Sequence, residues 1–459
     1  MDPKELHNTQ LPLHLWIENR QFGHLKQALR DMEIHELADM LVHVTDDAEL
    51  AIAFRMLPTE TAADILGEFE PDQQEHLLST LSGERVAQIL NEMPPDDRTE
   101  LLEELPGKLS QQLLNQLVGK ERKIAIDLMA YPEETIGRLM TPEFVAVRKD
   151  WSIEYVLRHI RRVAAERETV DMIYVVDDNW NYLDELRLQQ ILTAEDDQLV
   201  EDLMDHQGGL LNANDDQETA IDIFKKYDAT VLPAVDSTGI LVGIVTVDDV
   251  LDLQEEESTE DMQKMAGMAA LDESYLSASS WDMLLKRLPW LLLLLAFETG
   301  AVLVLKGFEK YLAMVAMFMP LINASAGNTG SQVSGLMIRA FAVNELGQKD
   351  WTRIFRRELL RGMLMGVILA TFSFGIAYGF EVSHDSTQCF NISISVAVAM
   401  FVAVTLANLL GAMLPFAFKS IGMDPAVTSG PFIACLMDIS SILIFFSIAS
   451  AMVSLTAAV

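Results

Sequence analysis

The sequence predicts a multidomain membrane protein with an all-α N-terminal superhelical domain, an α/β tandem module and an α-helical membrane domain of five spans. Three observations predict this arrangement. A short helical unit recurs through residues 35–118, a strand and helix pattern occurs twice between residues 136 and 253, and long apolar runs begin near residue 288. At 459 residues, the chain also exceeds what one hydrophobic core usually organises.

Charge divides the chain near the start of these apolar runs. Residues before Met283 include 60 acids and 22 bases, whereas the rest includes nine acids and 11 bases. Such an acidic half repels nucleic acid and attracts cations, although a merely solvated acidic surface is the alternative. We therefore expect cation binding and no nucleic-acid partner. Cys389 and Cys435 lack the spacing of a zinc site, and the N-terminus lacks the pattern of a secretion signal.

The first domain is predicted from proline pairs that open short helical segments. A proline at a first helical position, followed by acids, is a helix start signal, and the leucines of each segment recur at helical spacing. Short amphipathic helices of this kind stack into superhelical arrays. The pairs are Leu57-Pro58, Glu70-Pro71, Met93-Pro94 and Leu105-Pro106.

The tandem module follows, with each copy reading strand, helix, strand, strand, helix. This pattern resembles a pair of CBS domains, which often sense nucleotides or ions. The second copy keeps the nucleotide signature of that family in Gly243, Thr246 and Asp249. The first copy departs from it, with Asp184, Arg187 and Gln190 at the matching positions. The resemblance therefore implies that ATP, if bound, is bound by the second copy.

An acidic, glycine-poor segment links the module to the apolar runs. We expect a helix that acts as a lever or plug, with a plain charged linker as the alternative. The predicted boundaries are 1–130 for the helical domain, 131–200 and 201–253 for the two CBS copies, 254–285 for the linker helix and 286–459 for the membrane domain.

Five segments are long and apolar enough to cross a hydrocarbon core about 30 Å thick. They are residues 288–305, 311–336, 359–380, 392–418 and 430–455. Most lysines and arginines near the spans fall before the first, between the second and third, or between the fourth and fifth. The positive-inside rule then places the N-terminus in the cytoplasm and the C-terminus outside.

Polar residues inside the spans indicate function, because each costs free energy in hydrocarbon. Asp438 lies about two turns into the fifth span without a basic residue nearby in the sequence, so we expect it to face a cation pathway rather than to be a protonated structural residue. In the second span, Pro320 is expected to break the helix, and Gly327 and Gly330 to allow close backbone approach, so that freed carbonyl groups and side-chain amides line a cavity. The alternative for this span is helix packing through small residues. Glu298 is interpreted as a lateral helix contact, with a second polar site near the pathway as the alternative.

Several segments together resemble the MgtE family of magnesium transporters. They are AGNTGSQ followed by LMIRAFA, ANLLGAMLPF, MDPAVTSGPFIACLMD and TIGRLMTPEFVAV, and the resemblance covers essentially the whole chain. It implies a homodimer in the cell (inner) membrane, with a hydrated Mg²⁺ in a pore between the subunits. The matching pore residues are Asp438, Ala434, Gly327 and Asn328. Ser331 stands where the family more often has a second asparagine.

The same resemblance implies a gate that closes when cytoplasmic Mg²⁺ is high. Independently of the family, an excess of acids is expected to spread apart when unscreened and to compact when divalent ions bridge it. The matching regulatory positions are Asp249, Asp252, Glu257, Glu260, Asp261 and Asp424, with Asp96 and Asp97 in the helical domain.

Rival functions are distinguished by features of the spans. An anion channel with CBS domains is expected to have basic or hydroxyl-rich spans. An intramembrane aspartyl protease needs two aspartates within its spans, whereas the predicted spans of this chain contain one, Asp438. A membrane-anchored nucleotide sensor is supported only by Thr246 and Asp249. A transporter for another divalent cation, such as Mn²⁺ or Co²⁺, is the nearest alternative. We therefore expect a transporter rather than an enzyme.

Overall fold

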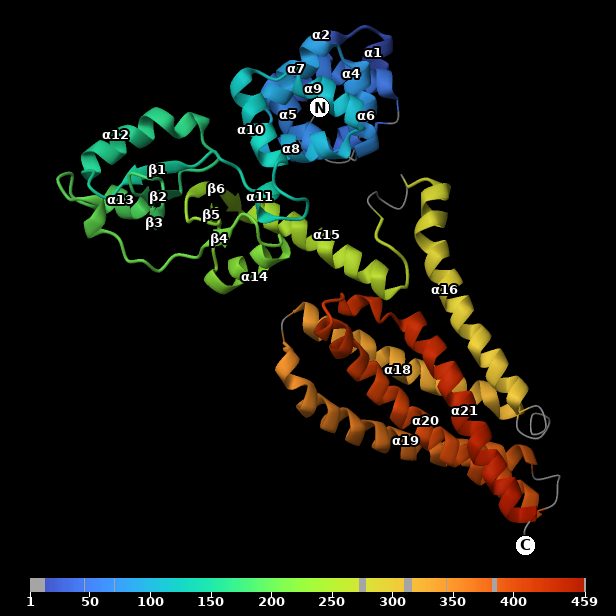
Figure 1. The fold of residues 1–459 in the computed structure, drawn as a ribbon. Coiled ribbons are helices and arrows are strands. Elements are labelled where there is room, and N and C mark those ends of the chain that lie inside the picture. Colours follow the sequence, from blue (N-terminus) through green and yellow to red (C-terminus); the bar gives the residue numbers. More distant parts are fainter. Residues whose placement is uncertain are drawn as a thin grey trace, which may run out of the picture. The chain divides into compact units, whose positions relative to one another are not determined.

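The computed structural model describes residues 13–44, 46–69, 71–271, 278–308, 316–343, 345–381 and 386–457. The chain forms two compact units, Met1–Glu257 and Ser258–Val459. Figure 1 shows the order of the elements along the chain, and each unit is described by itself below.

Short helices form the first part of the first unit and share one core, to which Leu25, Phe54, Leu66 and Ile89 contribute fully buried side chains. Prolines open several of these helices, as the sequence predicted, because a residue at a helix start has no intrahelical partner for its N–H. The helices are α1 (Leu13–Glu18), α2 (Phe22–Asp31), α3 (Ile34–Val42), α4 (Asp47–Met56), α5 (Thr59–Gly67), α6 (Pro71–Thr80), α7 (Gly83–Glu92), α8 (Pro95–Glu104), α9 (Gly107–Leu114) and α10 (Gly119–Met129).

A buried arginine fixes the start of α8. The Arg98 side chain is fully buried and donates to the carbonyl oxygens of Leu90 and Met93, each at 3.2 Å, and to Glu121 Oε2 on α10 at 2.8 Å. A buried charge needs such partners, because an unpaired one is very costly. This anchoring holds the acidic first turn of α8, with Asp96 and Asp97, in one orientation.

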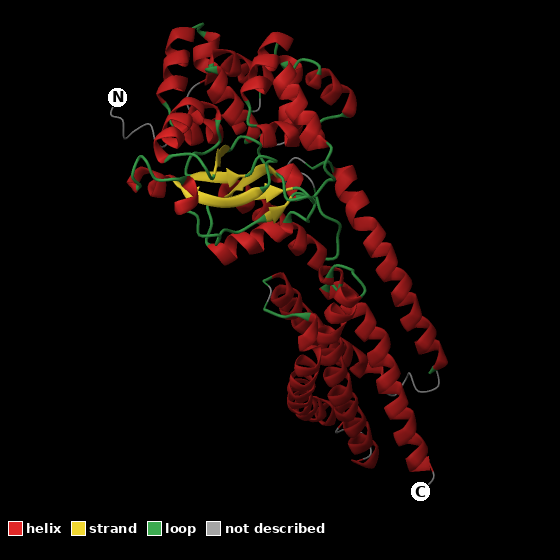
Figure 2. Cartoon of the chain, turned by 60° about the vertical axis from the view of Figure 1, so that its left-hand side comes forward, coloured by secondary structure: helices red, strands yellow, loops and turns green. Residues whose placement is uncertain are grey.

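The α/β module contains two three-stranded sheets, each with one parallel and one antiparallel pair (Figure 2). The predicted alternation of strand, helix, strand, strand and helix is confirmed in both copies. The first copy contains β1 (Val145–Arg148), α12 (Ile153–Val163), β2 (Met172–Val176), β3 (Tyr182–Arg187) and α13 (Leu188–Thr193), after α11 (Ile136–Leu139). The second contains β4 (Leu211–Asn212), α14 (Glu218–Tyr227), β5 (Val231–Val235), β6 (Leu241–Thr246) and α15 (Val247–Met265).

The two copies share a small core in which Tyr174 and Val176 pack with Val231, Leu241 and Ile244. Helix α15 follows β6 without a break and ends at Met265, where Gly267 has a φ of +78°. The linker helix is therefore the second half of α15 and does not extend to residue 285 as expected. A glycine at this left-handed position ends a helix without steric cost. Residues 272–277 of the expected linker lie outside the described residues.

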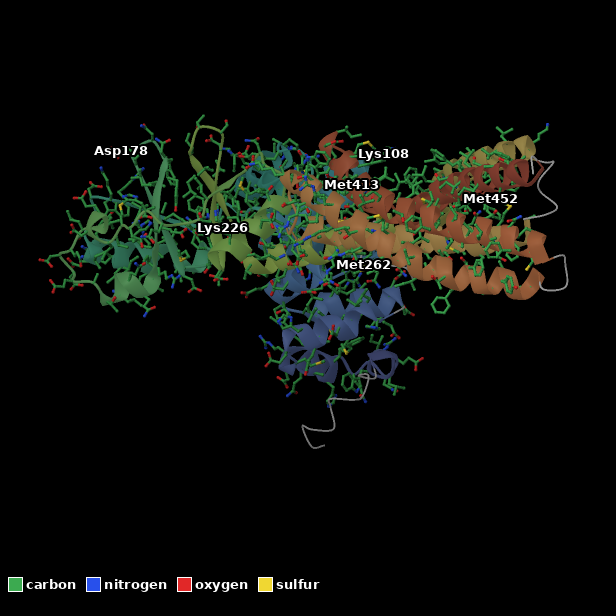
Figure 3. The ribbon with its side chains drawn as sticks, turned by 90° about the horizontal axis from the view of Figure 1, so that it is seen from below. Lys108, Asp178, Lys226, Met262, Met413 and Met452 are labelled. Atoms are coloured by element: carbon green, nitrogen blue, oxygen red, sulfur yellow. The ribbon has the colours of Figure 1, made fainter. Side chains whose placement is uncertain are left out.

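Long helices make up the second unit. They are α16 (Ser280–Gly307), α18 (Met319–Ala342), α19 (Trp351–Glu381), α20 (Ser386–Ser420) and α21 (Gly430–Ala457). Within the described residues, four helical segments are long and apolar enough to cross a membrane, namely Ser280–Gly307, Gln348–Phe380, Cys389–Ser420 and Gly430–Met452. Figure 3 shows side chains along these helices, with Met413 on α20 and Met452 on α21 labelled.

Helix α18 corresponds to the predicted second span but differs from it. It has 24 residues, yet it is not among the four apolar segments, since asparagine, serine and threonine side chains interrupt its apolar residues. The first residues of the predicted span, 311–315, lie outside the described residues. The expectation that Pro320 breaks the helix is wrong, because it occupies the first turn, where it removes no intrahelical hydrogen bond.

Glycines bring α18 against its neighbours, which is the small-residue packing that the sequence analysis gave as the alternative for this span. A Cβ atom on Gly411 of α20 would lie 2.3 Å from the carbonyl oxygen of Gly330, and one on Gly330 would lie 2.6 Å from Ile433 Cγ2 of α21. Only residues without a Cβ allow this approach, which is the small-residue packing common between membrane helices. The face of α18 that carries Gly330 is thereby held against α20 and α21.

The remaining described elements are short 3-10 turns between longer elements. They are η2 (Ala164–Glu166), η3 (Val200–Asp202), η4 (Ala316–Phe318), η5 (Gln348–Asp350) and η6 (Pro425–Val427).

Candidate cation sites in the soluble and membrane units

Acidic side chains from three segments converge in the first unit. Asp96 and Asp97 begin α8, Asp249 lies in the first turn of α15, and Glu168 lies in the loop before β2. Burial, together with the charge of Asp249, raises the pKa of Asp96 well above its usual range and that of Asp97 to about 7. Burial also raises the pKa of Asp249 to about 6. These carboxyl groups repel one another when all are ionised.

Within the described residues, no three of these side chains lie close enough together to hold a metal ion in this arrangement, but one oxygen of the group has no partner. Asp96 Oδ1 is shielded from solvent and accepts no hydrogen bond in the described part of the chain. Burial and the charge of Glu104, followed by those of Glu256, Asp249 and Asp252, raise the pKa of Glu100 to about 7. Crowded carboxylate oxygens are the ligands that divalent cations such as Mg²⁺ prefer.

The structure thus brings together Asp96, Asp97, Asp249 and Asp252 from the predicted regulatory set. It adds Glu100, Glu168 and Glu256, which the sequence analysis missed. Glu100 is one helical turn after Asp96 and Asp97, so helical spacing along α8 was the available signal. Glu168 is in a loop, and no sequence pattern related it to α8.

We expect the first unit to lose stability as pH rises in the absence of divalent cations. The pKa values of Asp97 and Glu100 are raised to about 7, so folding favours their protonated forms, and Asp97 contributes more because solvent screens the exposed Glu100. Stability from such groups is complete below the unfolded pKa and is lost as pH rises through the folded pKa. For a protein of residues 1–257 in EDTA, the Tm is expected to fall by about 5 °C or more between about pH 5 and about pH 8. Thermal unfolding followed by circular dichroism measures this.

Mg²⁺ should restore most of the lost Tm at the upper pH. The double variant Asp97→Asn, Glu100→Gln should show a shallower pH dependence, whereas the control variant Asp236→Asn should keep the parent slope, because Asp236 has a lowered pKa through bonds within its own turn. Equal slopes for the parent and the double variant would show that these acids do not set the pH dependence.

The nucleotide signature has local structural roles. A Cβ atom on Gly243 would lie 2.7 Å from Met140 Sδ and 3.0 Å from the carbonyl oxygen of Thr141, so only glycine fits. The hydroxyl of Thr246 donates to the carboxylate of Asp249. Asp249 therefore belongs both to this signature and to the acidic group.

A second acidic group lies in the second unit and includes the side chain of a lysine. Lys264 Nζ on α15 is 2.7 Å from Glu260 Oε1 and 2.9 Å from Asp424 Oδ2, just before η6. Partial burial alone lowers the pKa of Lys264, but its hydrogen bonds to Glu260 and Asp424 outweigh this and raise it. Burial and the nearby charge of Asp424 raise the pKa of Asp261.

The structure therefore brings together Glu260, Asp261 and Asp424 as predicted, and adds Lys264, which the sequence analysis missed. Its position one turn after Glu260 was the available signal. Glu257 is one turn before Asp261 on the same helix. Met265 packs near Gly335 of α18, where an added Cβ would be 3.6 Å from Met265 Cε. The end of α15 thus contacts both Asp424 and α18.

The predicted pathway residues lie on α18 and α21. Asp438 is half-buried on α21, and its carboxyl group is within hydrogen-bonding distance of that of Glu298 on α16. A Cβ atom on Gly327 would lie 3.6 Å from Ala434 Cα, so these two positions adjoin, whereas Asn328 is exposed at the next position of α18. The structure therefore brings Gly327 and Ala434 together and adds Glu298 beside Asp438.

Hydroxyl groups tie α18 to the start of α21. Ser331 Oγ donates to the carbonyl oxygen of Gly430 at 3.0 Å, and Ser334 Oγ donates to that of Thr428 at 2.7 Å. At this position, where the family more often has asparagine, the Ser331 hydroxyl thus forms a hydrogen bond to the backbone. The sequence analysis missed Ser334 and Thr428, which resemble ordinary small residues of a packed helix.

Comparisons with known proteins match separate parts of the chain, which correspond to the helical domain, the second CBS copy and the membrane domain. Three family models match: "MgtE intracellular N domain" over residues 23–134, "CBS domain" over residues 200–256 and "Divalent cation transporter" over residues 319–448. The magnesium transporter MgtE of Thermus thermophilus is 39% identical over 325 residues, which cover 70% of this chain and 71% of that protein. This chain belongs to the MgtE family.

Other MgtE relatives agree. The magnesium transporter MgtE of Enterococcus faecalis is 32% identical over 71% of this chain and 70% of its own length. The crystal structure of the cytosolic domain of the Mg²⁺ channel MgtE in complex with ATP matches with a TM-score of 0.52 and 33% identity, covering 53% of this chain and all of that chain. MgtE proteins are transporters rather than enzymes, and the apolar helices make this chain a multi-pass membrane protein.

Proposed function

We propose that this MgtE protein is a Mg²⁺-selective channel or transporter for magnesium uptake, with Asp438 in the cation pathway. The observation that carries this proposal is the half-buried carboxyl group of Asp438 inside an apolar helix, beside a second carboxyl group and with no ion pair to a base in the described residues. A carboxyl group at that depth is retained for a pathway or a contact. Mg²⁺ sheds water reluctantly and is bound well through its water shell by carboxylate, amide and carbonyl oxygens.

The proposed pore residues are Asp438, Ala434, Gly327 and Asn328. Gly327 and Ala434 adjoin through helix packing, and backbone oxygens at these positions are proposed to contact the hydrated ion. Uptake is driven by the membrane potential, since a divalent ion gains roughly 4.6 kcal/mol on entry at −100 mV. Mn²⁺ or Co²⁺ transport is the alternative. Mg²⁺ uptake into proteoliposomes, with and without Asp438, tests the function.

The acidic groups support a gate that senses cytoplasmic Mg²⁺. In the first unit, Mg²⁺ bound among Asp96, Asp97 and Asp249 would offset their repulsion, with Asp252 nearby. In the second unit, Glu260 and Asp261 near the end of α15 lie close to Asp424. Glu257 completes the proposed regulatory set. Binding at these positions would favour one of two arrangements of α15 and so close the pathway.

Assembly and orientation are proposed on the same grounds. A homodimer would place two copies of Asp438 at one pore, and lipid would cover the exposed apolar side chains of α16 and α19, such as Leu295, Leu303 and Phe372. The protein would lie in the cell (inner) membrane with the N-terminus in the cytoplasm and the C-terminus outside.

Nucleotide binding is a second proposed property of the first unit. It is supported by the ATP complex of the related cytosolic domain. The proposed contacts are Gly243, Thr246 and Asp249, and Asp249 also belongs to the acidic group. ATP bound there would therefore change the negative charge around a Mg²⁺ ion in the acidic group of the first unit.

Lys264 is expected to hold the end of α15 in place when Mg²⁺ is low. Its ammonium group joins Glu260 to Asp424, so Lys264→Gln leaves these carboxylates without their cation and releases the contact. We expect higher Mg²⁺ uptake into proteoliposomes at low internal Mg²⁺, by roughly threefold to tenfold for a contact of ~1 kcal/mol. Inhibition by high internal Mg²⁺ should remain.

Lys349→Gln is the matched control, because it removes the same charge from an exposed position in the same unit. Lys264→Arg, which keeps the charge, should behave as the parent. Unchanged or lower uptake in Lys264→Gln at low internal Mg²⁺ would contradict the tethering role.

A further inference from the structure

Packing between α16 and α21 sets the position of Glu298. The ring of Phe297 meets that of Phe432 edge to face at 5.8 Å. One turn away, the Cys435 thiol donates to the carbonyl oxygen of Leu294 at 3.9 Å, and a Cβ atom on Gly300 would lie 3.3 Å from Ile439 Cδ1. These contacts flank Glu298 on both sides, so its place against α21 follows from the register of the two helices.

The Glu298 side chain reaches the residue proposed to meet the transported ion. Its carboxyl group is within hydrogen-bonding distance of the Asp438 carboxyl group and of the Cys435 thiol. Both acids lie in candidate membrane spans, Ser280–Gly307 and Gly430–Met452. Within the described residues, no lysine, arginine or histidine forms an ion pair with either acid.

We propose that Glu298 is a second acidic side chain of the membrane cation site and determines its preference for divalent over monovalent cations. The proposal rests on the proposed function of Asp438. Two carboxylates at one place in a medium of low dielectric attract a divalent ion about twice as strongly as a monovalent one. A single Na⁺ or K⁺ leaves one charge uncompensated, and that is costly inside the membrane.

The competing interpretation is a helix contact without a role in ion selection. Both interpretations predict some loss of stability when Glu298 is changed. They differ in ion discrimination, since a packing contact has no reason to distinguish Mg²⁺ from Na⁺. The ratio of Mg²⁺ to Na⁺ permeation therefore separates them.

The test uses the full-length protein in proteoliposomes, with Mg²⁺ and Na⁺ uptake measured for each variant. Glu298→Gln keeps the side-chain length but removes the charge. We expect the half-saturating Mg²⁺ concentration to rise about tenfold and the ratio of Mg²⁺ to Na⁺ uptake to fall about tenfold, which corresponds to ~1.4 kcal/mol. Glu298→Asp keeps the charge but withdraws it from Asp438, so both values should lie between those of the parent and Glu298→Gln.

Glu345→Gln is the control, because it makes the same change at an exposed position outside the candidate spans. Parent values of affinity and ion ratio in Glu298→Gln would overturn the proposal while leaving Asp438 in place. Full Mg²⁺ uptake by Asp438→Asn would instead show that the proposed function fails. If Glu298→Gln does not fold, judged by gel filtration in detergent, the intermediate values expected of Glu298→Asp decide the question.

Discussion

Replacing Asp438 with alanine should abolish Mg²⁺ uptake into proteoliposomes. The carboxyl group lies inside an apolar helix and is half-buried, so water would offset only part of the loss of the cation contact that we propose for it. Removing one partner of a desolvated charge pair costs ~2–5 kcal/mol. Uptake at subsaturating Mg²⁺ is therefore expected to fall by about 100-fold or more. A fluorescent Mg²⁺ indicator trapped in the vesicles measures it.

Two further variants make this result specific. Asp438→Asn keeps the shape and should lose nearly as much uptake, because the lost property is charge. Ser440→Ala is a matched control on α21, since the Ser440 hydroxyl donates to the carbonyl oxygen of Leu436 within the helix and should leave uptake near the parent rate. Parent-level uptake by Asp438→Ala would remove Asp438 from the pathway.

Removing all residues before Ser279 should give a protein that conducts Mg²⁺ but does not respond to internal Mg²⁺. The deletion removes the start of α8 and the whole of α15, which carry all of the proposed regulatory acids except Asp424. Helices α16 to α21, with Glu298 and Asp438, remain. Allosteric couplings typically change an equilibrium by 5-fold to 150-fold, so we expect high internal Mg²⁺ to reduce parent uptake by about tenfold or more and truncated uptake hardly at all.

The control for the truncation keeps the whole chain. The triple variant Asp96→Asn, Asp97→Asn, Asp249→Asn removes charge from the acidic group of the first unit without removing a domain. It should need a higher internal Mg²⁺ concentration for closure than the parent. A truncated protein that is still fully inhibited by internal Mg²⁺ would refute the gate in the soluble part.

Particular residues show how far sequence reasoning reached. The proline pairs predicted helix starts in the first domain, because proline has a fixed φ and lacks an N–H. The same rule was misapplied at Pro320, which was expected to interrupt a span but opens α18. The sequence analysis placed Pro320 inside the span, whereas α18 begins at Met319. Apolar composition locates helix ends poorly when the preceding residues are also apolar.

The sites show the same limit more sharply. Asp438 was identifiable because an acid in an apolar run is costly wherever the run folds. Its neighbour Glu298 is 140 positions earlier in the chain, and no sequence spacing relates the two. Lys264 was overlooked for a different reason, since a lysine in an acidic helix usually remains in solvent.

The sequence by itself determined the order of the domains, four of the five predicted spans and the acidic character of the soluble half, because composition and local periodicity are properties of neighbouring residues. Tertiary structure alone decided which charges meet: Glu298 with Asp438, Lys264 with Asp424, and Asp96 with Asp249. These pairs depend on the packing of distant helices, and electrostatic energy depends on distance and burial rather than on position in the chain.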